Sequence, residues 1–274
     1  MSSSGRGSGG RALIIELIGT PGAGKTTLAQ QLVRELREKG SEASTVIEAA
    51  RPHAARTRFG RAVNRLPDRV RRPLLWQLFN ALGALQGVVF AFKHRALARR
   101  VVWTQLTRPD QAATRRHTLY WYLQLAGRYR LLVATSNERE AILLDDGFLH
   151  RVVAMFASHV EEPNPKEVAA YVDLVPQPDA LIHVVAPRRE CEARVRARGV
   201  WRHSRGITDS ELSRAIASAE KAVEAAVRRA KELGWTVVEI ENGDDLVDLT
   251  ERGLAWSLPT AASGANAVRT WASH

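Results

Sequence analysis

The residues best suited to chemistry by their types and spacing form one short segment, Gly19-Thr20-Pro21-Gly22-Ala23-Gly24-Lys25-Thr26. This segment matches the phosphate-binding pattern G-x-x-x-x-G-K-[ST] at every fixed position. Its glycines let backbone N–H groups turn toward phosphate oxygens, and a helix that begins there adds unpaired N–H groups and partial positive charge. We expect Lys25 to reach the β- and γ-phosphates of a nucleotide and the Thr26 hydroxyl to bind Mg²⁺.

The elements on either side of this loop agree with that interpretation. The apolar run Ala12–Ile18 precedes the loop and a helical pattern from Thr27 to Lys39 follows it, so strand, loop and helix come in the order that the motif requires. A glycine-rich turn that binds nothing is the alternative, and the complete motif disfavours it. We therefore predict a nucleotide-binding loop over 19–26, with Thr27 beside it.

Alternating strand and helix patterns indicate an α/β fold with a parallel sheet covered on both faces. The expected strands are Ala12–Ile18, Ala43–Ile47, Ala141–Leu144, Ala180–Val185 and Thr236–Ile240. Gly40 marks the end of the first helix, and Thr208-Asp209-Ser210-Glu211 is a capping box that opens a late helix. Ligands of such sheets lie at the carboxyl ends of the strands, so the residues that follow each run are candidates for the site.

Carboxylates follow two of the expected strands. Asp145 and Asp146 come directly after the third run as candidate Mg²⁺ ligands, and Asp145 is also a candidate to accept the acceptor's proton. The alternative for this pair is a helix N-cap near Phe148. Glu48 closes the second run, where a carboxylate can face the γ-phosphate and act as a base. An exposed strand-end glutamate is the alternative for Glu48.

A basic helical segment follows the fourth run. Arg194 and Arg198 are four residues apart and share one helix face, from which planar guanidinium groups can clamp phosphates. The alternative is an ordinary basic helix whose arginines pair with Glu190 and Glu192.

Length and composition favour one domain. A chain of 274 residues fits a single α/β domain with insertions, which we place at 12–256, with a disordered leader at 1–11 and a loosely ordered tail at 257–274. The single cysteine, Cys191, excludes an internal disulfide and fits the cytoplasm. The eight histidines lack the spacing of a structural zinc site.

The net charge of +11 is concentrated in one region. Residues 51–135 hold 17 Lys and Arg against 2 Asp, a local excess of 17 − 2 = +15. Such a field favours an anionic partner, whether a phosphorylated substrate, nucleic acid or anionic lipid. A solvated face of Arg-rich helices is the alternative.

The same region contains a long uncharged segment. Leu74 to Phe92 is 19 residues without a charge, has basic flanks, and includes Gly83-x-x-x-Gly87. We predict no transmembrane span, because strands from before and after this segment must join one sheet. Buried helices that line an acceptor pocket are expected, and a membrane-surface or re-entrant contact is the alternative.

The part of the site that binds the phosphate acceptor would come from the helical insertion at about 52–135 and the residues just before it. Candidates for holding an anionic acceptor are Arg51, Arg56 and Arg58. Aromatic candidates for its apolar part are Trp76, Phe79, Trp121 and Tyr122, although core packing is the more frequent role of any one of them.

The strand pattern P-D-x-x-h-x-h begins at Pro178-Asp179, and a helix with spaced arginines follows it up to Gly199. With the phosphate loop, this pattern resembles the P-loop nucleoside and nucleotide kinases, particularly thymidylate-kinase-like and deoxynucleoside-kinase-like proteins. The resemblance covers roughly residues 12 to 50 and 141 to 245. One departure is Asp145-Asp146, where the family carries Asp-Arg or Glu-Arg, so an arginine that contacts the acceptor is missing at position 146.

The resemblance implies a three-layer P-loop NTPase fold whose five parallel strands have the order 2-3-1-4-5. It implies that Arg194 and Arg198 belong to a phosphate-clamping lid over about 194–208, that Glu48 is the catalytic base, and that adenine lies near Asn242. The region 52–135 matches no substrate signature of the family, so the acceptor stays unassigned.

Our leading hypothesis is an ATP- and Mg²⁺-dependent phosphotransferase that moves the γ-phosphate to a small-molecule hydroxyl or phosphate. One alternative is a regulatory P-loop ATPase whose basic insertion binds nucleic acid or an anionic membrane. Another is a phosphate-binding module without turnover, which the complete Lys25-Thr26 pair disfavours. The chain lacks an Asn-Lys-x-Asp motif, which argues against a GTPase. A homodimer of the chain is possible on this evidence from the sequence.

Overall fold

The computed structural model describes residues 12–46, 48–49, 62–63, 66–108, 112, 114–135, 140–199 and 208–242. Within this part of the chain, five strands form one parallel sheet in the order β2-β3-β1-β4-β5. The strands are β1 (Leu13–Gly19), β2 (Glu42–Thr45), β3 (Glu140–Leu144), β4 (Ala180–Val185) and β5 (Val237–Glu241). The predicted fold class and strand order are confirmed, and the bounds of each expected strand differ from the observed ones by at most two residues.

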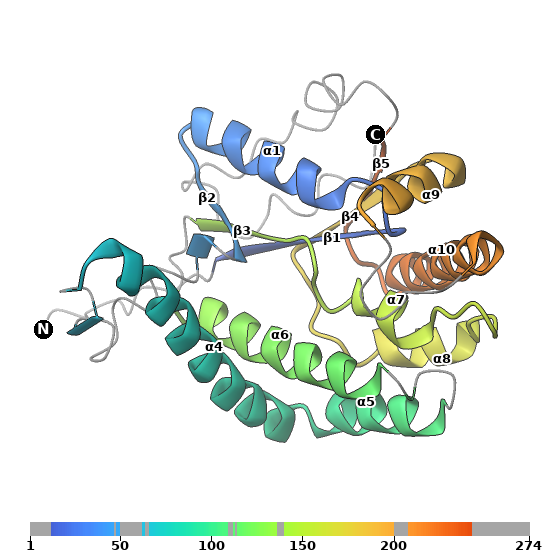
Figure 1. Cartoon of the computed structure of the whole chain (residues 1–274), viewed down its shortest axis with the longest axis horizontal. Helices are drawn as coiled ribbons and strands as arrows, with labels where there is room; N and C mark the ends of the chain where they lie inside the picture. The colour runs from blue at the N-terminus through green and yellow to red at the C-terminus, as the bar shows by residue number, and fades with distance from the viewer. Residues whose placement is uncertain are drawn as a thin grey trace, which may run out of the picture.

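Helices cover both faces of this sheet (Figure 1). They are α1 (Lys25–Glu38), α4 (Asp68–Lys93), α5 (Arg95–Thr107), α6 (Arg115–Thr135), α7 (Arg151–Phe156), α8 (Pro165–Val172), α9 (Arg188–Ala197) and α10 (Asp209–Glu232). Alternate residues of β1 serve the two faces, as expected for a strand buried on both sides. Ile15 and Leu17 belong to the core under α1 and α9, whereas Ile18 belongs to the core under α6, α7 and α10.

The helix boundaries follow the expected local signals. Gly40, at φ +82°, stops α1 as the sequence predicts. Thr208 and Glu211 form the predicted capping box of α10: the Thr208 hydroxyl accepts from the Glu211 N–H, and the Glu211 carboxylate accepts from the Thr208 N–H. The leader 1–11, the tail 257–274 and the lid residues 200–207 lie outside the described residues.

The uncharged segment of the sequence forms most of α4, which packs lengthwise on α6. A Cβ on Gly127 of α6 would lie 1.6 Å from the carbonyl oxygen of Gly83, and one on Gly87 would lie 2.3 Å from that of Leu123. The Gly83-x-x-x-Gly87 motif therefore brings two helix backbones together inside the chain, as small residues do at close helix crossings.

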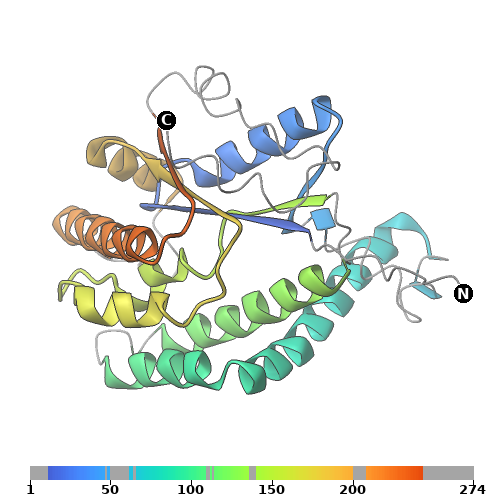
Figure 2. The same ribbon diagram turned by 180° about the vertical axis from the view of Figure 1, so that it is seen from behind.

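The expectation that this segment is buried is only half right. The side of α4 that faces the rest of the domain is buried, but only 28% of its most apolar 18-residue window is buried. Of the described residues, α4 is the one helix that is long and apolar enough to cross a membrane, with a mean hydropathy of 1.5. Figure 2 shows α4 and α5 along the outer edge of the molecule, with α6 between α4 and the sheet.

Replacing Gly127 by Ala should destabilise the fold, because its new Cβ would meet the backbone of Gly83. Backbone cannot move aside as a flexible side chain can, so we expect a loss of about 1–3 kcal/mol in the free energy of unfolding. Gly83→Ala is the matched control, since its Cβ meets the end of the Gln124 side chain at 3.1 Å. Urea unfolding measures both variants, and equal losses would contradict the close backbone contact.

Candidate nucleotide-binding and phosphotransfer site

The phosphate loop joins β1 to α1 in a conformation that requires glycine at two positions. Gly22 and Gly24 have φ angles of +89° and +91°. Both also lie against other parts of the chain: a Cβ on Gly22 would be 2.5 Å from the Cys191 carbonyl oxygen, and one on Gly24 would be 2.1 Å from the Asn242 amide nitrogen. The loop is therefore held between α9 and the end of β5.

Lys25 is the first residue of α1, and its side chain turns back into the loop. Its Nζ donates to the carbonyl oxygens of Gly19 and Thr20, at 2.9 and 3.1 Å. Burial lowers the pKa of Lys25 to about 8, a shift that Asp146 and Asp145 oppose and Arg198 increases. The ammonium group lies where the loop curves round it, which is the position expected for a phosphate contact.

Thr26 and Asp145 come together as the sequence predicts. The Thr26 hydroxyl donates to Oδ2 of Asp145 at 2.9 Å, which links the start of α1 to the end of β3. A hydroxyl and a carboxylate oxygen side by side are hard oxygen donors, the kind that Mg²⁺ prefers. The two residues therefore fit a Mg²⁺ ion that takes its other ligands from phosphate and water. Thr27 is exposed in the first turn of α1.

Asp146 pairs with Arg151, the first residue of α7, at 2.5 Å. The Asp146 carboxylate remains half exposed, but the protein atoms around it still raise its pKa by desolvation. The negative charge of Asp145 raises this pKa further. The positive charges of Arg151, Lys25 and Arg128 act in the opposite direction. Position 146 is an aspartate, and Arg151 brings a guanidinium beside it from five residues further on. Sequence reasoning missed Arg151 because it considered only position 146.

Trp121 belongs to an aromatic cluster that surrounds Arg128. The Arg128 guanidinium lies 5.3 Å from the ring of Trp76, 5.8 Å from that of Phe79 and 5.5 Å from that of Trp121. It also donates to the side-chain oxygen of Asn80 at 2.8 Å. Three of the aromatic residues predicted as acceptor contacts therefore surround Arg128, which the sequence analysis did not identify as a candidate. A signal existed, since Arg128 follows Trp121 by two helical turns on α6.

Glu16 is a second residue that the sequence reasoning missed. It lies buried in β1 and accepts the backbone N–H groups of Leu149 and His150, at 2.5 and 3.1 Å. Burial raises the pKa of Glu16 to about 8 in spite of these hydrogen bonds. Gly147 makes room for it, because a Cβ there would lie 2.3 Å from Cδ of Glu16. Glu16 therefore holds the loop that carries Asp145 and Asp146, and its signal was a lone carboxylate in an apolar run.

Arg194 and Arg198 differ in their contacts. Arg194 donates to the carbonyl oxygen of Gly22 at 3.4 Å and to Glu190 at 2.8 Å, so the loop contact and the predicted ion pair coexist. Arg198 ends α9 with an exposed side chain.

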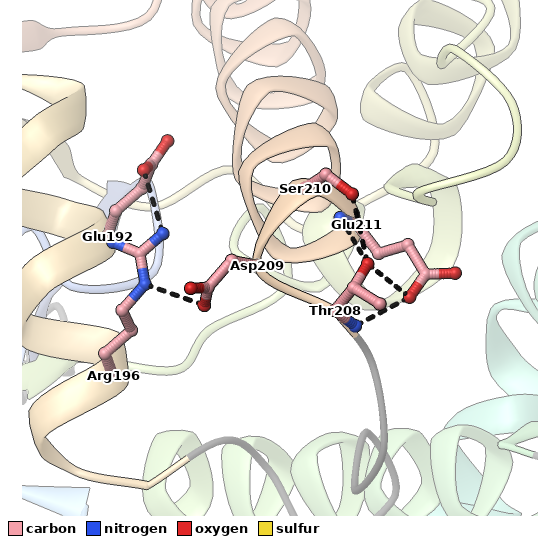
Figure 3. Close-up of polar contacts among 6 residues, drawn as sticks. All are labelled: Glu192, Arg196, Thr208, Asp209, Ser210 and Glu211. Atoms are coloured by element: carbon pink, nitrogen blue, oxygen red, sulfur yellow. Dashed lines mark hydrogen bonds and ion pairs between the residues drawn. The ribbon is translucent and has the colours of Figure 1, made fainter.

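Arg196, which lies between them in the sequence, has a structural role. Figure 3 shows it between Glu192 of α9 and Asp209 of α10, with Arg196 atoms 3.5 and 3.2 Å from the two carboxylates. The same view shows the Thr208–Glu211 cap at the start of α10. The described residues before and after 200–207 are thus tied to the domain.

The expected placement of Glu48 is wrong. Strand β2 ends at Thr45, and helical residues begin at Val46. The Glu48 carboxylate accepts the Thr45 N–H and pairs with Arg37 at 2.9 Å. Arg37 lies in the last turn of α1, about 18 Å along the helix from Lys25. Glu48 is therefore an exposed ion-pair partner remote from the loop, which is close to the alternative role of an exposed strand-end glutamate.

Asn242 lies directly against the phosphate loop. Its buried amide donates to the carbonyl oxygen of Ala23 at 2.6 Å, and its own N–H donates to that of Val185. Asn242 therefore supports the phosphate loop from behind. The acceptor candidates Arg51, Arg56 and Arg58 lie outside the described residues.

No protein-family model matches the chain, and no curated protein matches its sequence. Among solved structures, it is similar to deoxyadenosine kinase from M. mycoides with bound dATP, at 12% identity and a TM-score of 0.44, covering 89% of this chain and 100% of that one. The same enzyme with bound dCTP gives 13% identity and a TM-score of 0.36, with 89% and 99% covered. A structure from Thermus thermophilus gives 21% and 0.37, with 89% and 95% covered.

The fold assignment itself rests on the strand order and on the loop between β1 and α1.

Replacing Glu16 by Gln should change how stability depends on pH. Glu16 has a pKa of about 8 in the fold against 4.5 ordinarily, so its contribution to stability is complete below about pH 4.5 and is lost as pH rises through about 8. Gln keeps the accepting oxygen without the charge. The stability of Glu16→Gln relative to wild type should therefore rise across this window, by at most about 1.4 kcal/mol per pH unit.

Denaturant unfolding at a series of pH values measures this difference. Glu38→Gln, at an exposed position of α1, is the matched control and should show a difference that hardly varies with pH. A flat difference for Glu16→Gln as well would contradict the raised pKa.

Proposed function

We propose that this chain is an ATP- and Mg²⁺-dependent kinase that transfers the γ-phosphate to a small-molecule acceptor. The observation that carries the proposal is the convergence of four groups at the carboxyl end of the sheet. Lys25 and Thr26 lie at the phosphate loop, Asp145 is hydrogen-bonded to Thr26, and Arg194 contacts the loop from α9. Phosphoryl transfer requires positioned positive charge and a carboxylate for the metal, and these residues supply both.

On the donor side, the chain's own groups hold and neutralise phosphate. Loop N–H groups and the N-terminus of α1 would bind the phosphate oxygens, and Lys25 would stabilise charge that builds up as the γ-phosphoryl leaves. Mg²⁺ held by Thr26 and Asp145 would supply further positive charge at the phosphates. Arg194 and Arg198 would add guanidinium groups from the lid side.

On the acceptor side, Asp146 takes the place that Glu48 was expected to fill. Its carboxylate adjoins Asp145 and is half exposed, and a raised pKa makes it a stronger base for an acceptor proton. Arg151 orients it. The Arg128 cluster, with Trp76 and Trp121, is the candidate wall for the rest of the acceptor, which a flat group or an anion would suit.

Incubation of purified chain with ATP, Mg²⁺ and a broad panel of nucleosides, nucleotides and sugars tests the proposal. We expect phosphate transfer to at least one acceptor class, and a rate about 10²-fold or more lower in Lys25→Ala. Arg34→Ala, at an exposed position of α1, is the control and should keep the wild-type rate. Transfer to no acceptor, or a wild-type rate in Lys25→Ala, would overturn the proposal. Hydrolysis of ATP that no acceptor stimulates would instead favour the regulatory ATPase.

Asparagine at the two neighbouring carboxylates should separate metal binding from proton transfer. Asp145→Asn removes the charged partner of Thr26, so it should raise the Mg²⁺ concentration needed for half-maximal rate. Asp146→Asn should lower kcat by about 10²-fold with little change in that concentration. Rate measurements over a Mg²⁺ titration distinguish the two effects, and the same Mg²⁺ shift in both variants would contradict the separate roles.

A further inference from the structure

The outer side of α4 and α5 carries large apolar side chains that the fold leaves exposed. On α4 exposed positions recur every three or four residues from Val70 to Phe92 when Gln77 and Ala81 are included, which places them on one face of the helix. We define the outer face by its exposed apolar residues, which are Val70, Leu74, Leu85, Val88 and Phe92 of α4 and Val102, Trp103 and Leu106 of α5. Phe92 is 72% exposed and Trp103 is 62% exposed, although both are among the largest apolar side chains.

The outer face groups several large exposed side chains on two consecutive helices, with Gln77 and Ala81 between Leu74 and Leu85. Isolated exposed apolar residues are normal on any protein, but eight large ones on two consecutive helices are more than single exposures explain. The opposite side of α4, with Phe79, Gly83 and Gly87, is the side that packs toward α6. Figures 1 and 2 both show α4 and α5 at the edge of the molecule most distant from α1.

Cations outnumber acidic residues along the outer face. Asp68, the first residue of α4, is the acidic residue at its border, and it pairs with Arg71 and Arg72. From 69 to 108 the sequence has eight Lys and Arg and no Asp or Glu. Arg69 lies near the start of α4, and Lys93, Arg95 and Arg99 lie where α4 meets α5. All four are exposed, and none makes an ion pair within the described part of the chain.

We propose that the outer face of α4 and α5 docks on the surface of an anionic lipid membrane, with both helices lying along the interface. Exposed aromatic and aliphatic side chains would enter the boundary between headgroups and acyl chains, and the bordering Lys and Arg would bind acidic headgroups. This contact is independent of the proposed kinase activity. It would place the domain on the membrane without a spanning segment.

The observations favour this occupant over three others. A second copy of the chain would bring its own Arg69, Lys93 and Arg99 against these cations. The one acidic residue at the border of the face, Asp68, already pairs with Arg71 and Arg72. Nucleic acid would use the charges but leave Leu85, Val88 and Phe92 without a partner. A spanning orientation would remove α4 from α6, with which its glycines make close backbone contact.

Co-sedimentation of the full chain with lipid vesicles tests the proposal. We expect binding to phosphatidylcholine vesicles that contain phosphatidylserine, weaker binding as salt rises, and little binding to phosphatidylcholine alone. Absence of binding to the anionic vesicles at low salt would overturn the proposal.

Two variants separate the apolar contribution from the charges. Phe92→Ser with Trp103→Ser should weaken vesicle binding by about tenfold or more, because two large side chains no longer enter the interface. Arg99→Glu should weaken it by about fivefold or more. Matched controls outside the face are Val160→Ser, where the side chain is 71% exposed, and Arg228→Glu on the exposed side of α10. Circular dichroism confirms that each variant is folded.

Three other results would overturn the proposed membrane contact. Equal vesicle binding by wild type and the Phe92–Trp103 variant would overturn the proposal, because charge alone would then explain adsorption. Tighter binding to RNA or duplex DNA than to anionic vesicles at the same salt would also overturn it in favour of nucleic acid. A dimer in sedimentation velocity that the Phe92–Trp103 variant abolishes would overturn it in favour of a second copy.

Discussion

The hydrogen bond between Thr26 and Asp145 joins two segments that lie 119 residues apart, and the candidate site depends on it. The bond forms because β1 and β3 are neighbours in the sheet and leave it at the same edge. Glu16 pairs in register with Leu144, and its carboxylate holds the backbone at Leu149 and His150. One buried side chain thus folds the loop after β3 back over β1, which places Asp145 beside Thr26. The placement of Asp145 beside Thr26 follows from strand order and from this anchor.

Patterns local to the chain predicted the fold and the donor side. A strand, a glycine loop and a helix are visible over 12–39, and parallel strands bring their carboxyl ends together, so the sequence alone places Thr26 and Asp145 at one edge of the sheet. The prediction for Glu48 failed because β2 ends at Thr45 and helical residues follow at once, so that the Glu48 side chain lies against Arg37. Arg128 was missed because its position depends on how α6 docks against α4, which single-sequence periodicity does not contain.

Charges in the site are buried at a cost that phosphate binding would offset. Burial is the main cause that lowers the pKa of Lys25 and raises that of Glu16, so the two shifts disfavour the charged form of each group. A phosphate anion beside Lys25 acts in the opposite direction, because it favours the ammonium form. The same burial strengthens the interaction with phosphate, since a low local dielectric weakens screening by water. Burial of Lys25 therefore lowers the stability of the folded chain, and it places a positive charge where the proposed phosphate would bind.

The uncharged run from Leu74 to Phe92 has two physical explanations, one for each side of α4. Packing on α6 explains the inner side, because Gly83 and Gly87 allow backbone contact and apolar neighbours are buried around them. It does not explain Leu85, Val88 and Phe92, which the described fold leaves exposed. Apolar surface in water opposes solubility, and cations without acidic partners repel one another. A face that combines both features is unfavourable in isolation, and an anionic lipid surface offsets the two costs together by burying the side chains and neutralising the charges.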